Sequence, residues 1–371
     1  MKYILQISTG SWHGAHDRPE EIIRRIEEAA GRIPVDRVII GCNTDASVYR
    51  AVGTYLRGHG IAMLLWLPVF AEVGALAEPD RALDVFGNRI PGPAGEEGET
   101  FVFGCPSSRR NLRIVTDIWE KHFAGCGFDG VFLDRIRSQS FACGVSGVLS
   151  CGCPRCRAAF LEKGVDLNEV RDRYEHEKDA FFDLASCPAD GAFVLKNRLA
   201  QRFFEAKEEI VAEAVTELTR WFKGKGLTVG LDLFAPLVSR FVGQNYALIT
   251  QGADFIKPML YRRTEAPAGI AYEYAMFEKH APGARGRAAF SMDRAFLETQ
   301  LEAVGRVSCA KYPGIEINYD ADLVKTDPAY ITESLAAIRD RGFEGAALCW
   351  NLMRAPGAHL DAVADPAERT V

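Results

Sequence analysis

The sequence lacks the marks of three common classes of protein. No apolar run reaches eighteen residues, so we expect no membrane-spanning helix. Basic residues are not in excess, because 44 Lys and Arg stand against 50 Asp and Glu, and this argues against nucleic-acid binding through a basic face. The opening segment, MKYILQISTGS, holds too short an apolar stretch for a secretory signal. We therefore expect a cytoplasmic protein.

Histidine is scarce, and no cofactor motif occurs. The seven His residues are well separated and form no H-E-x-x-H pattern, so a catalytic zinc with His ligands is not expected. The turn after the first apolar run, STGSWHGAH, does not match the G-x-G-x-x-G of dinucleotide-binding folds. We therefore expect no organic cofactor.

Cysteine, in contrast, is abundant, with ten residues in the chain. Without an export signal a disulfide framework is not expected, and clustered thiols then indicate a metal site. Three cysteines lie together in LSCGCPRCR, residues 149–157, where Cys151, Cys153 and Cys156 form a C-x-C-x-x-C pattern.

Eight short apolar runs alternate with amphipathic stretches along the chain. Apolar runs of this length are typical of parallel strands that are covered on both faces. Between them, PEEIIRRIEEAA (19–30) begins with a proline and acids, as helices do, and the stretches 110–123 and 202–222 carry apolar residues at three- and four-residue spacing. The expected strands are 2–8, 37–42, 61–70, 129–137, 227–235, 254–261, 313–319 and 345–352.

Eight strands that alternate with helices predict a single (β/α)8 barrel over residues 1–371. A doubly wound open sheet is the alternative. Two connections are long: 71–104 after the third strand, and an insertion at 138–197 after the fourth. Both leave the carboxyl end of a strand, where barrel enzymes build their active sites, so we expect functional walls or lids there.

Polar side chains stand at the ends of the predicted strands. An acid inside an apolar strand is costly unless it is paired or hydrogen-bonded, and Asp134, Asp232 and Glu316 would converge on one barrel mouth. A buried ionic network with Lys257 or nearby arginines is the alternative explanation for these acids. The candidate substrate contacts are Trp12, His13, Trp66, Arg137, Lys257, Tyr261, Asn318 and Trp350.

Two facing carboxylates with aromatic residues around them are typical of glycoside cleavage. One carboxyl group must be protonated to donate to the leaving oxygen, and the other must be ionised to attack or to activate water. The expected substrate is therefore a small carbohydrate or glycoside. We assign Glu316 as nucleophile or base and Asp134 as acid, with the reverse assignment open, and Asp232 as a third acid or a ligand of a substrate hydroxyl.

Three motifs resemble barrel glycoside hydrolases: DGVFLDRIR (129–137), the C-x-C-x-x-C pattern and DFIKPMLY (254–261). The cysteine pattern is similar to the zinc cluster of the family 42 β-galactosidases, in which one cysteine after strand three joins a later C-x-C-x-x-C. The resemblance implies a zinc site that Cys105, from FGCPSS, forms with the later three cysteines. It also places Glu316 at the strand-seven nucleophile position of that clan.

The chain departs from these families at the strand-four acid. The clan of family 42 has a Glu after an Asn there, whereas Asp134 stands at this position and the one Asn-Glu pair, Asn168–Glu169, falls in the insertion. A chitinase-like D-x-x-D-x-D-x-E pattern is also incomplete, since Phe132 and Ile136 replace two of its acids. The resemblance therefore implies the fold and not the substrate.

A zinc bound by four thiolates would be structural, because the closed tetrahedron has no open position for water or substrate. Free thiols, or a redox use of Cys153 and Cys156 in C-P-x-C, are the alternatives. Cys143 competes with Cys105 as the fourth ligand. A zinc here would tie the loops after strands three and four together beside Asp134.

The leading hypothesis is a barrel glycoside hydrolase without nucleic-acid or membrane partners. A sugar-binding barrel without hydrolysis is the second hypothesis. The third is a lyase or aldolase that forms a Schiff base at Lys257. The sequence leaves a homo-oligomer open.

Overall fold

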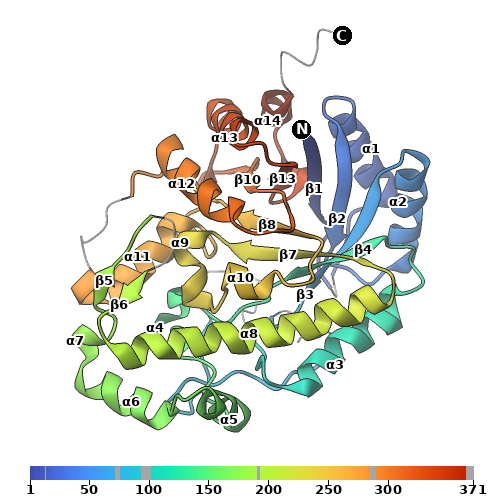
Figure 1. The fold of residues 1–371 in the computed structure, drawn as a ribbon. Coiled ribbons are helices and arrows are strands. Elements are labelled where there is room, and N and C mark those ends of the chain that lie inside the picture. The colour runs from blue at the N-terminus through green and yellow to red at the C-terminus, as the bar shows by residue number, and fades with distance from the viewer. Residues whose placement is uncertain (13, 72–75, 93–101, 190–192, 285–289, 365–371) are drawn as a thin grey trace.

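The computed structural model describes residues 1–12, 14–71, 76–92, 102–189, 193–284 and 290–364. The barrel strands are β1 (Lys2–Ser8), β2 (Val35–Gly41), β3 (Ala62–Pro68), β4 (Gly130–Asp134), β7 (Thr228–Phe234), β8 (Phe255–Met259), β10 (Gly314–Glu316) and β13 (Gly345–Cys349). All pair in parallel, β1 lies between β2 and β13, and the pairing of β8 with β10 closes the ring (Figure 1). The single (β/α)8 barrel is therefore confirmed, and the doubly wound open sheet is excluded.

Away from the carboxyl ends of the strands, the interior of the barrel is a packed core rather than a channel. Alternate residues along each strand point inwards, and the rings of Phe132 and Phe255 stack there with centroids 6.1 Å apart. The Arg37 guanidinium lies 4.8 Å from the Phe255 centroid. Gly230 is required opposite this ring, because a Cβ there would come within 2.1 Å of it. The carboxyl ends of the strands, above this layer, are left for polar side chains.

Helices cover the outside of the barrel. The first, α1 (Pro19–Ala30), begins with proline, carries acids in its first turn and buries Ile22, Ile26 and Ala29, as its sequence predicts. The other outer helices are α2 (Ala46–Gly58), α3 (Arg109–Ile118) with a π-helical end (Trp119–Phe123), α8 (Arg198–Gly224), α9 (Pro236–Ser239), α10 (Tyr246–Ile249), α11 (Ile270–His280), α12 (Arg294–Gly305), α13 (Pro328–Asp340) and α14 (Gly357–Val363). Short 3-10 turns are Arg240–Val242, Pro282–Ala284 and Leu352–Arg354.

A small helical layer between β4 and α8 packs against α8, within residues 138–197, where the sequence predicts an insertion. Figure 1 shows α5, α6 and α7 grouped on one side of α8. The rings of Phe160 and Phe203 stack across this contact with centroids 5.1 Å apart. The elements are a 3-10 turn (Phe141–Cys143), α4 (Gly144–Val148), α5 (Pro154–Glu162), α6 (Leu167–His176), α7 (Lys178–Phe181) and the hairpin of β5 (Leu184–Ser186) and β6 (Val194–Leu195).

The long connection after β3 packs against this layer. Asp84 forms a β-bridge with Ser150, and its buried carboxylate accepts a hydrogen bond of 2.9 Å from the Ser146 hydroxyl. Gly104 donates its N–H to the Phe70 carbonyl at 2.6 Å, which joins the far end of the connection to its start. The two long connections therefore form one wall beside the carboxyl ends of β3 and β4.

Seven of the eight barrel strands end earlier than the sequence predicts. β4 ends at Asp134 rather than at residue 137, because Arg135 has a φ of 52°, which extended backbone cannot adopt. Cys42 likewise follows the end of β2 with a φ of 72°. β10 has only three residues, and two further short pieces flank it: β9 (Ala310–Lys311) and the hairpin of β11 (Tyr319–Asp320) with β12 (Val324–Lys325).

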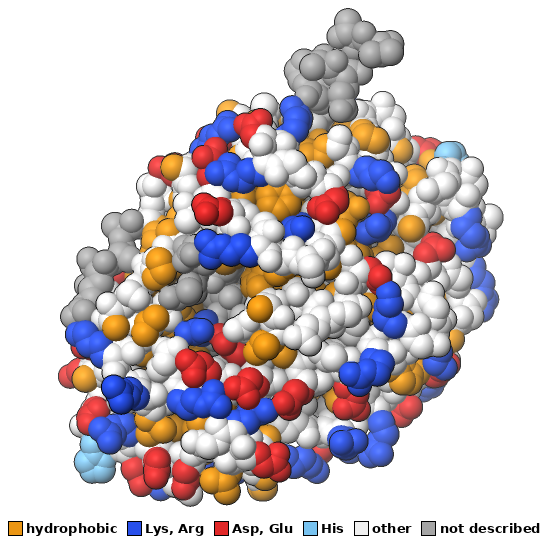
Figure 2. Space-filling view, in the orientation of Figure 1, with side chains coloured by type: hydrophobic (Ala, Val, Ile, Leu, Met, Phe, Trp, Pro, Cys, Tyr) orange, Lys and Arg blue, Asp and Glu red, His pale blue; other side chains and the backbone are white. Residues whose placement is uncertain are grey.

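The outer surface mixes charges of both signs. Figure 2 shows Lys and Arg interspersed with Asp and Glu over one face, without a broad field of either sign. Among the helices of the described ranges, none is both long and apolar enough to cross a membrane.

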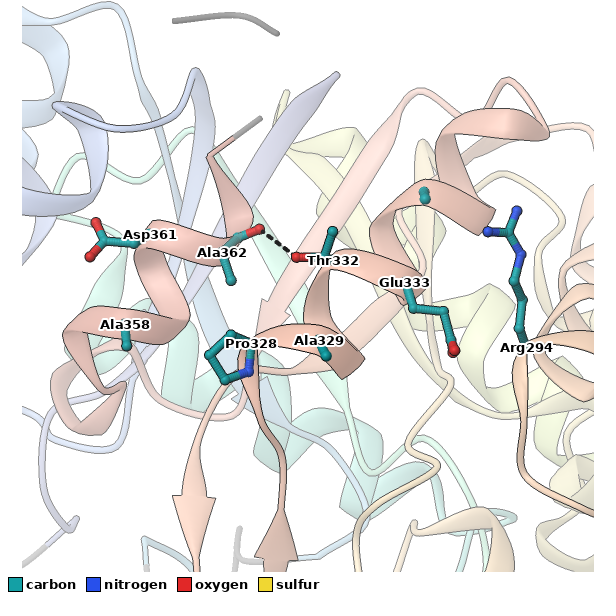
Figure 3. A pocket seen from close by; sticks show the side chains of 9 residues that line it. Arg294, Pro328, Ala329, Thr332, Glu333, Ala358, Asp361 and Ala362 are labelled. Carbon is teal, nitrogen blue, oxygen red and sulfur yellow. Dashed lines mark hydrogen bonds between the residues drawn. The ribbon is translucent and has the colours of Figure 1, made fainter. Parts of the chain in front are cut away.

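A surface depression of about 750 Å³ lies among the outer helices α12, α13 and α14 (Figure 3). Four of its nine lining residues are alanines, and the Thr332 hydroxyl donates a hydrogen bond of 3.4 Å to the Ala362 carbonyl across it. It does not contain the acids predicted from the strand ends.

Candidate active site and metal centre

Neighbouring strands bring the predicted acids to one rim of the barrel. Asp232 pairs in register with Lys257 on β8, and Glu316 pairs with Cys349 on β13. Asp134 on β4 and Asp232 on β7 each come directly after the last paired position of these two adjacent strands. Because parallel strands end at the same rim, these side chains share the carboxyl end of the barrel.

Asp134 is the most exposed of the three predicted acids. Its Oδ2 accepts a hydrogen bond of 2.8 Å from Nε1 of Trp66, and its Oδ1 accepts one of 2.5 Å from the N–H of Arg135. The residue is only half-buried. Carboxylate oxygens have two acceptor sites each, so Asp134 keeps capacity for a proton after both bonds are made. Trp66 orients this carboxylate.

Asp232 is a buried acid that pairs with the buried ammonium group of Lys257. Lys257 Nζ donates to Asp232 Oδ2 at 2.9 Å, to the Tyr261 hydroxyl at 3.0 Å and to Gln6 Oε1 at 3.2 Å. Lys257 is fully buried and Asp232 is 3% exposed, so solvent does not weaken the pair. Within the described ranges, Asp232 Oδ1 has no hydrogen-bond partner.

Burial and nearby charges act in opposite directions on this pair. Burial raises the pKa of Asp232, the Lys257 charge lowers it and the Asp134 charge raises it, with a net value of about 7. Burial is the largest single effect on Lys257 and lowers its pKa, but the charge and hydrogen bond of Asp232, with contributions from Cys349 and Asp134, together raise the pKa overall. Lys257 therefore keeps its positive charge, while Asp232 changes charge near neutral pH.

Gln6 was not among the residues predicted from the sequence. It lies on the inner face of β1 and is 2% exposed. The signal was a polar residue inside the apolar run KYILQIS, at a position that alternation places towards the barrel axis.

Glu316 ends β10, as predicted, but its carboxylate is enclosed. Its Oε1 accepts hydrogen bonds from the Arg263 N–H at 2.8 Å and from the Thr264 hydroxyl at 3.1 Å, and its Oε2 accepts one from the Tyr330 hydroxyl. The residue has no exposed surface. Burial raises its pKa, and these hydrogen bonds act in the opposite direction. In this structure Glu316 holds the loop after β8 against α13.

We expect Glu316→Ala to lower the free energy of unfolding by about 2–3 kcal/mol, because the donors of Tyr330, Arg263 and Thr264 lose their acceptor inside the protein. Urea unfolding measures the change. Glu316→Gln keeps an acceptor oxygen and should lose less, while Glu302→Ala on exposed α12 surface serves as a neutral control. An unchanged unfolding energy for Glu316→Ala would contradict the proposed support of the loop.

The predicted aromatic contacts separate into two places. Trp350 is half-buried and meets Tyr261 edge-on, with centroids 6.3 Å apart, beside Lys257. Trp12 packs edge-on against the buried Phe123 at 6.4 Å. His13 lies outside the described residues.

Asn318 and Arg137 are buried at the rim. Asn318 Oδ1 accepts hydrogen bonds from the N–H groups of Trp350, at 2.6 Å, and Asn351, at 2.8 Å, so it fixes the loop after β13. The Arg137 guanidinium lies over the rings of Phe103, at 4.9 Å, and Phe234, at 4.5 Å.

The structure brings the four predicted cysteines together. Cys105 comes from the connection after β3, and the other three come from the start of α5 and the turn before it. Cys105 Sγ lies 3.3 Å from Cys153 Sγ and 3.4 Å from Cys156 Sγ, and all four sulfurs, including that of Cys151, lie within 4.8 Å of one another. Cys143 is not part of this group.

This spacing fits a tetrahedral metal. Four sulfurs at 2.3 Å from a zinc ion are about 3.8 Å apart, which lies between the shortest and the longest separations in the cluster. All four residues are buried. The cluster could therefore hold a metal ion with four thiolate ligands.

Comparisons with known proteins found solved structures that are similar to this chain. No family model and no curated protein sequence matches the chain. The glycoside hydrolase domain of PgaB (BpsB) from Bordetella bronchiseptica is similar with a TM-score of 0.63 and 14% identity, over 98% of each chain.

Two further solved structures are similar over most of this chain. An α-L-fucosidase, isoenzyme 2 of Paenibacillus thiaminolyticus, has a TM-score of 0.54 and 12% identity, over 97% of this chain and 48% of that one. The spore cortex-lytic enzyme SleL of Bacillus megaterium QM B1551 has a TM-score of 0.50 and 10% identity, over 98% and 73%. At these identities the likeness gives the barrel fold, and it provides no evidence for family 42 specifically.

Proposed function

We propose that this protein is a glycoside hydrolase in which Asp134 and Asp232 are the working carboxylates. The observation that carries the proposal is their place on adjacent strands at the barrel rim, one half-buried and one beside a buried lysine. Paired carboxylates in unlike environments can take different protonation states, as glycosidic cleavage requires. The likeness to barrel hydrolases supports this chemistry.

Asp134 is the proton donor in this proposal. It is the more exposed acid, and Trp66 fixes one of its oxygens so that the other side of the carboxyl group can meet the glycosidic oxygen. The proton passes from Asp134 to the leaving oxygen as the bond to the anomeric carbon breaks. Water then forms the new bond to that carbon and gives a proton back to Asp134, which restores the acid.

Asp232 acts in its ionised form. Lys257 favours a negative charge on Asp232, and this charge stabilises the positive charge that develops on the sugar ring in the transition state. Oδ1 of Asp232 is buried and has no partner among the described residues, and we assign it as the acceptor for a substrate hydroxyl. Glu316, whose two oxygens are occupied, supports the loop after β8 rather than attacking the sugar.

Aromatic side chains at the rim provide the sugar platform. Trp350 and Tyr261 lie together beside Lys257, where a ring face can cover one side of the substrate. Arg137 lies close enough to Asp232 for its charge to favour the ionised form of that carboxyl group.

The proposed metal is a structural zinc bound by Cys105, Cys151, Cys153 and Cys156. With four thiolates bound, the zinc has no position for water, so its role is to hold the connection after β3 to the start of α5. The chemistry stays with the carboxylates.

Lys257→Met is expected to move the acidic limb of the pH profile of kcat/KM to higher pH. Loss of the positive charge raises the pKa of Asp232 further above its value of about 7, so ionised Asp232 forms only at higher pH. Asp232→Asn should remove this limb, and Lys223→Ala, on the exposed end of α8, should leave it in place. A limb that stays at the same pH in Lys257→Met would contradict the role given to Asp232.

The test of the proposed function is hydrolysis of a panel of aryl glycosides by the full chain and by Asp134→Asn and Asp232→Asn. Release of aryl alcohol above background by the natural chain supports the proposal when Asp232→Asn loses it throughout and Asp134→Asn loses it for leaving groups that need protonation. Equal background from all three proteins overturns it.

A sugar-binding barrel without hydrolysis is the second candidate, favoured by the enclosed carboxylate of Glu316. It predicts sugar binding without bond cleavage. The lyase or aldolase alternative is disfavoured, because a Schiff base requires a neutral amine and the Asp232 charge raises the pKa of Lys257 despite its burial.

A further inference from the structure

A second cavity, lined by several charged residues, lies at the barrel rim beside Glu316. Its volume is about 420 Å³, within the range of pockets that hold small ligands. It lies between the loop after β8, the start of α11 and the hairpin of β11 and β12. Its lining residues are Arg262, Arg263, Thr264, Glu265, Ala271, Tyr272 and Lys325.

The floor of this cavity is joined to the candidate active site. Arg263 and Thr264 donate their hydrogen bonds to Glu316, and Tyr261, which precedes them, contacts Lys257. Thr264 also forms a β-bridge with Val324, so the hairpin and the loop are one rigid unit. A sugar chain that leaves the barrel mouth on this side would reach the cavity next.

Positive charge predominates in the lining. The exposed Arg263 guanidinium lies 5.5 Å from the Tyr330 ring centroid, and no carboxylate of the described residues forms an ion pair with it. Lys325 pairs with Glu265, but the two side chains are 53% and 60% exposed, and such surface pairs exchange easily with a ligand.

A buried donor adds to these charges. Arg262 is 5% exposed, and its terminal nitrogens bond to Met292, Glu333 and Ser334. Its Nε has no hydrogen-bond partner among the described residues. An unpaired buried N–H of this kind is costly unless a ligand or water accepts from it.

The start of α11 also lies at this cavity and bears on anion binding. Its N-cap residue, Gly269, provides no side-chain cap, and the first-turn residues Ala271 and Tyr272 line the cavity. The amide groups of a first helical turn and the helix dipole favour an anion. The buried Glu273 of this turn accepts the Ala268 N–H at 3.1 Å, so the cations of Arg263 and Lys325 are the main attraction for an external anion.

We propose that this cavity is a subsite for an anionic sugar residue, one that carries a carboxylate or a sulfate group, next to the cleaved bond. The inference rests on the proposed function, because the subsite extends the same cleft. Arg263 and Lys325 would bind the anion, and Arg262 Nε would donate a hydrogen bond to one of its oxygens.

Binding to the full-length Asp134→Asn variant tests the subsite without turnover. The probes are a uronic-acid trisaccharide, its carboxyl-reduced neutral form and a sulfated trisaccharide, each titrated by calorimetry at low and high salt. We expect at least one acidic probe to bind about tenfold more tightly than the neutral one at low salt. The carboxylate and sulfate arms distinguish the two sources of charge.

The matched control compares two double variants that each remove two cations. Arg263→Ala with Lys325→Ala should abolish the preference for acidic probes, whereas Lys223→Ala with Lys225→Ala at the end of α8 should keep it. Equal binding of acidic and neutral probes, or a preference that survives the first double variant, overturns the inference. Hydrolysis of neutral aryl glycosides by the natural chain tests the proposed function separately, because neutral substrates do not need the anionic subsite.

Discussion

Asp134→Asn is expected to lower kcat/KM for alkyl glycosides by about 10³-fold, because the amide cannot protonate the leaving oxygen. The substitution keeps an acceptor for the Trp66 indole N–H and loses the acceptor for the Arg135 N–H, so the fold around β4 is checked for each variant. Dinitrophenyl glycosides leave without protonation, and the loss for them should be much smaller. The dependence on the leaving group thus identifies Asp134 as the acid rather than as a structural residue.

The measurement is kcat/KM over a series of leaving groups, with circular dichroism to check that each variant is folded. Asp322→Asn, on the exposed turn of the β11 and β12 hairpin, removes the same charge near the same rim and should leave the whole series unchanged. A uniform loss for all leaving groups would assign Asp134 to binding or to structure. An unchanged kcat/KM for every leaving group would show that Asp134 is not part of the active site.

The fold could be predicted from the sequence because parallel barrels repeat one local pattern. Runs such as DGVFLDRIR and LTVGLDLFA are apolar on both faces, and the helices between them carry apolar stripes. The positions of Asp134 and Asp232 follow from the same pattern, since strand ends meet at one rim. Strand ends were less predictable, because the left-handed backbone at Arg135 depends on contacts with the neighbouring loop.

The roles of the acids could not be predicted from local sequence. Glu316 occupies the expected strand end, yet its partners Thr264 and Tyr330 come from a different strand loop and from α13. Lys257 likewise finds Gln6 across the barrel, far away in the chain. Hydrogen bonds between distant elements decide whether a carboxylate is free or occupied, and spacing along the chain does not record them.

The cysteine cluster also shows what local sequence can predict and what only packing decides. The C-x-C-x-x-C pattern identifies three thiols at once, because their spacing is local. The fourth could be Cys105 or Cys143 from the sequence, and only the packing of the connection after β3 against α5 selects Cys105.

Cys151→Ser with Cys153→Ser is expected to abolish metal binding and to lower the free energy of unfolding by about 4 kcal/mol, because the bound ion stabilises only the folded state. Metal analysis of the natural chain should find about one zinc ion per molecule. The loss of stability exceeds that expected for Glu316→Ala, since two long connections lose their common anchor. Treatment with a strong chelator should reproduce it without any change of sequence.

Loss of the metal should also lower activity at temperatures where the protein stays folded. Gly104, next to Cys105, donates its N–H to the Phe70 carbonyl at 2.6 Å, and Phe70 donates its own N–H to the Arg135 carbonyl at 3.3 Å. These bonds lead from the cysteine cluster to the residue beside Asp134, whose Oδ1 accepts the Arg135 N–H. Movement of the wall after β3 therefore changes the position of the acid, and a shift of about 1 Å is enough to slow catalysis.

Cys309→Ser is the matched control, because this half-buried cysteine lies outside the cluster. It should retain the zinc, the unfolding energy and the activity of the natural chain. A natural chain purified without chelator that contains no metal, and whose stability a chelator does not change, would show that the four thiols pack as a hydrophobic cluster instead. Metal that remains bound in the double cysteine variant would place the ion elsewhere in the protein.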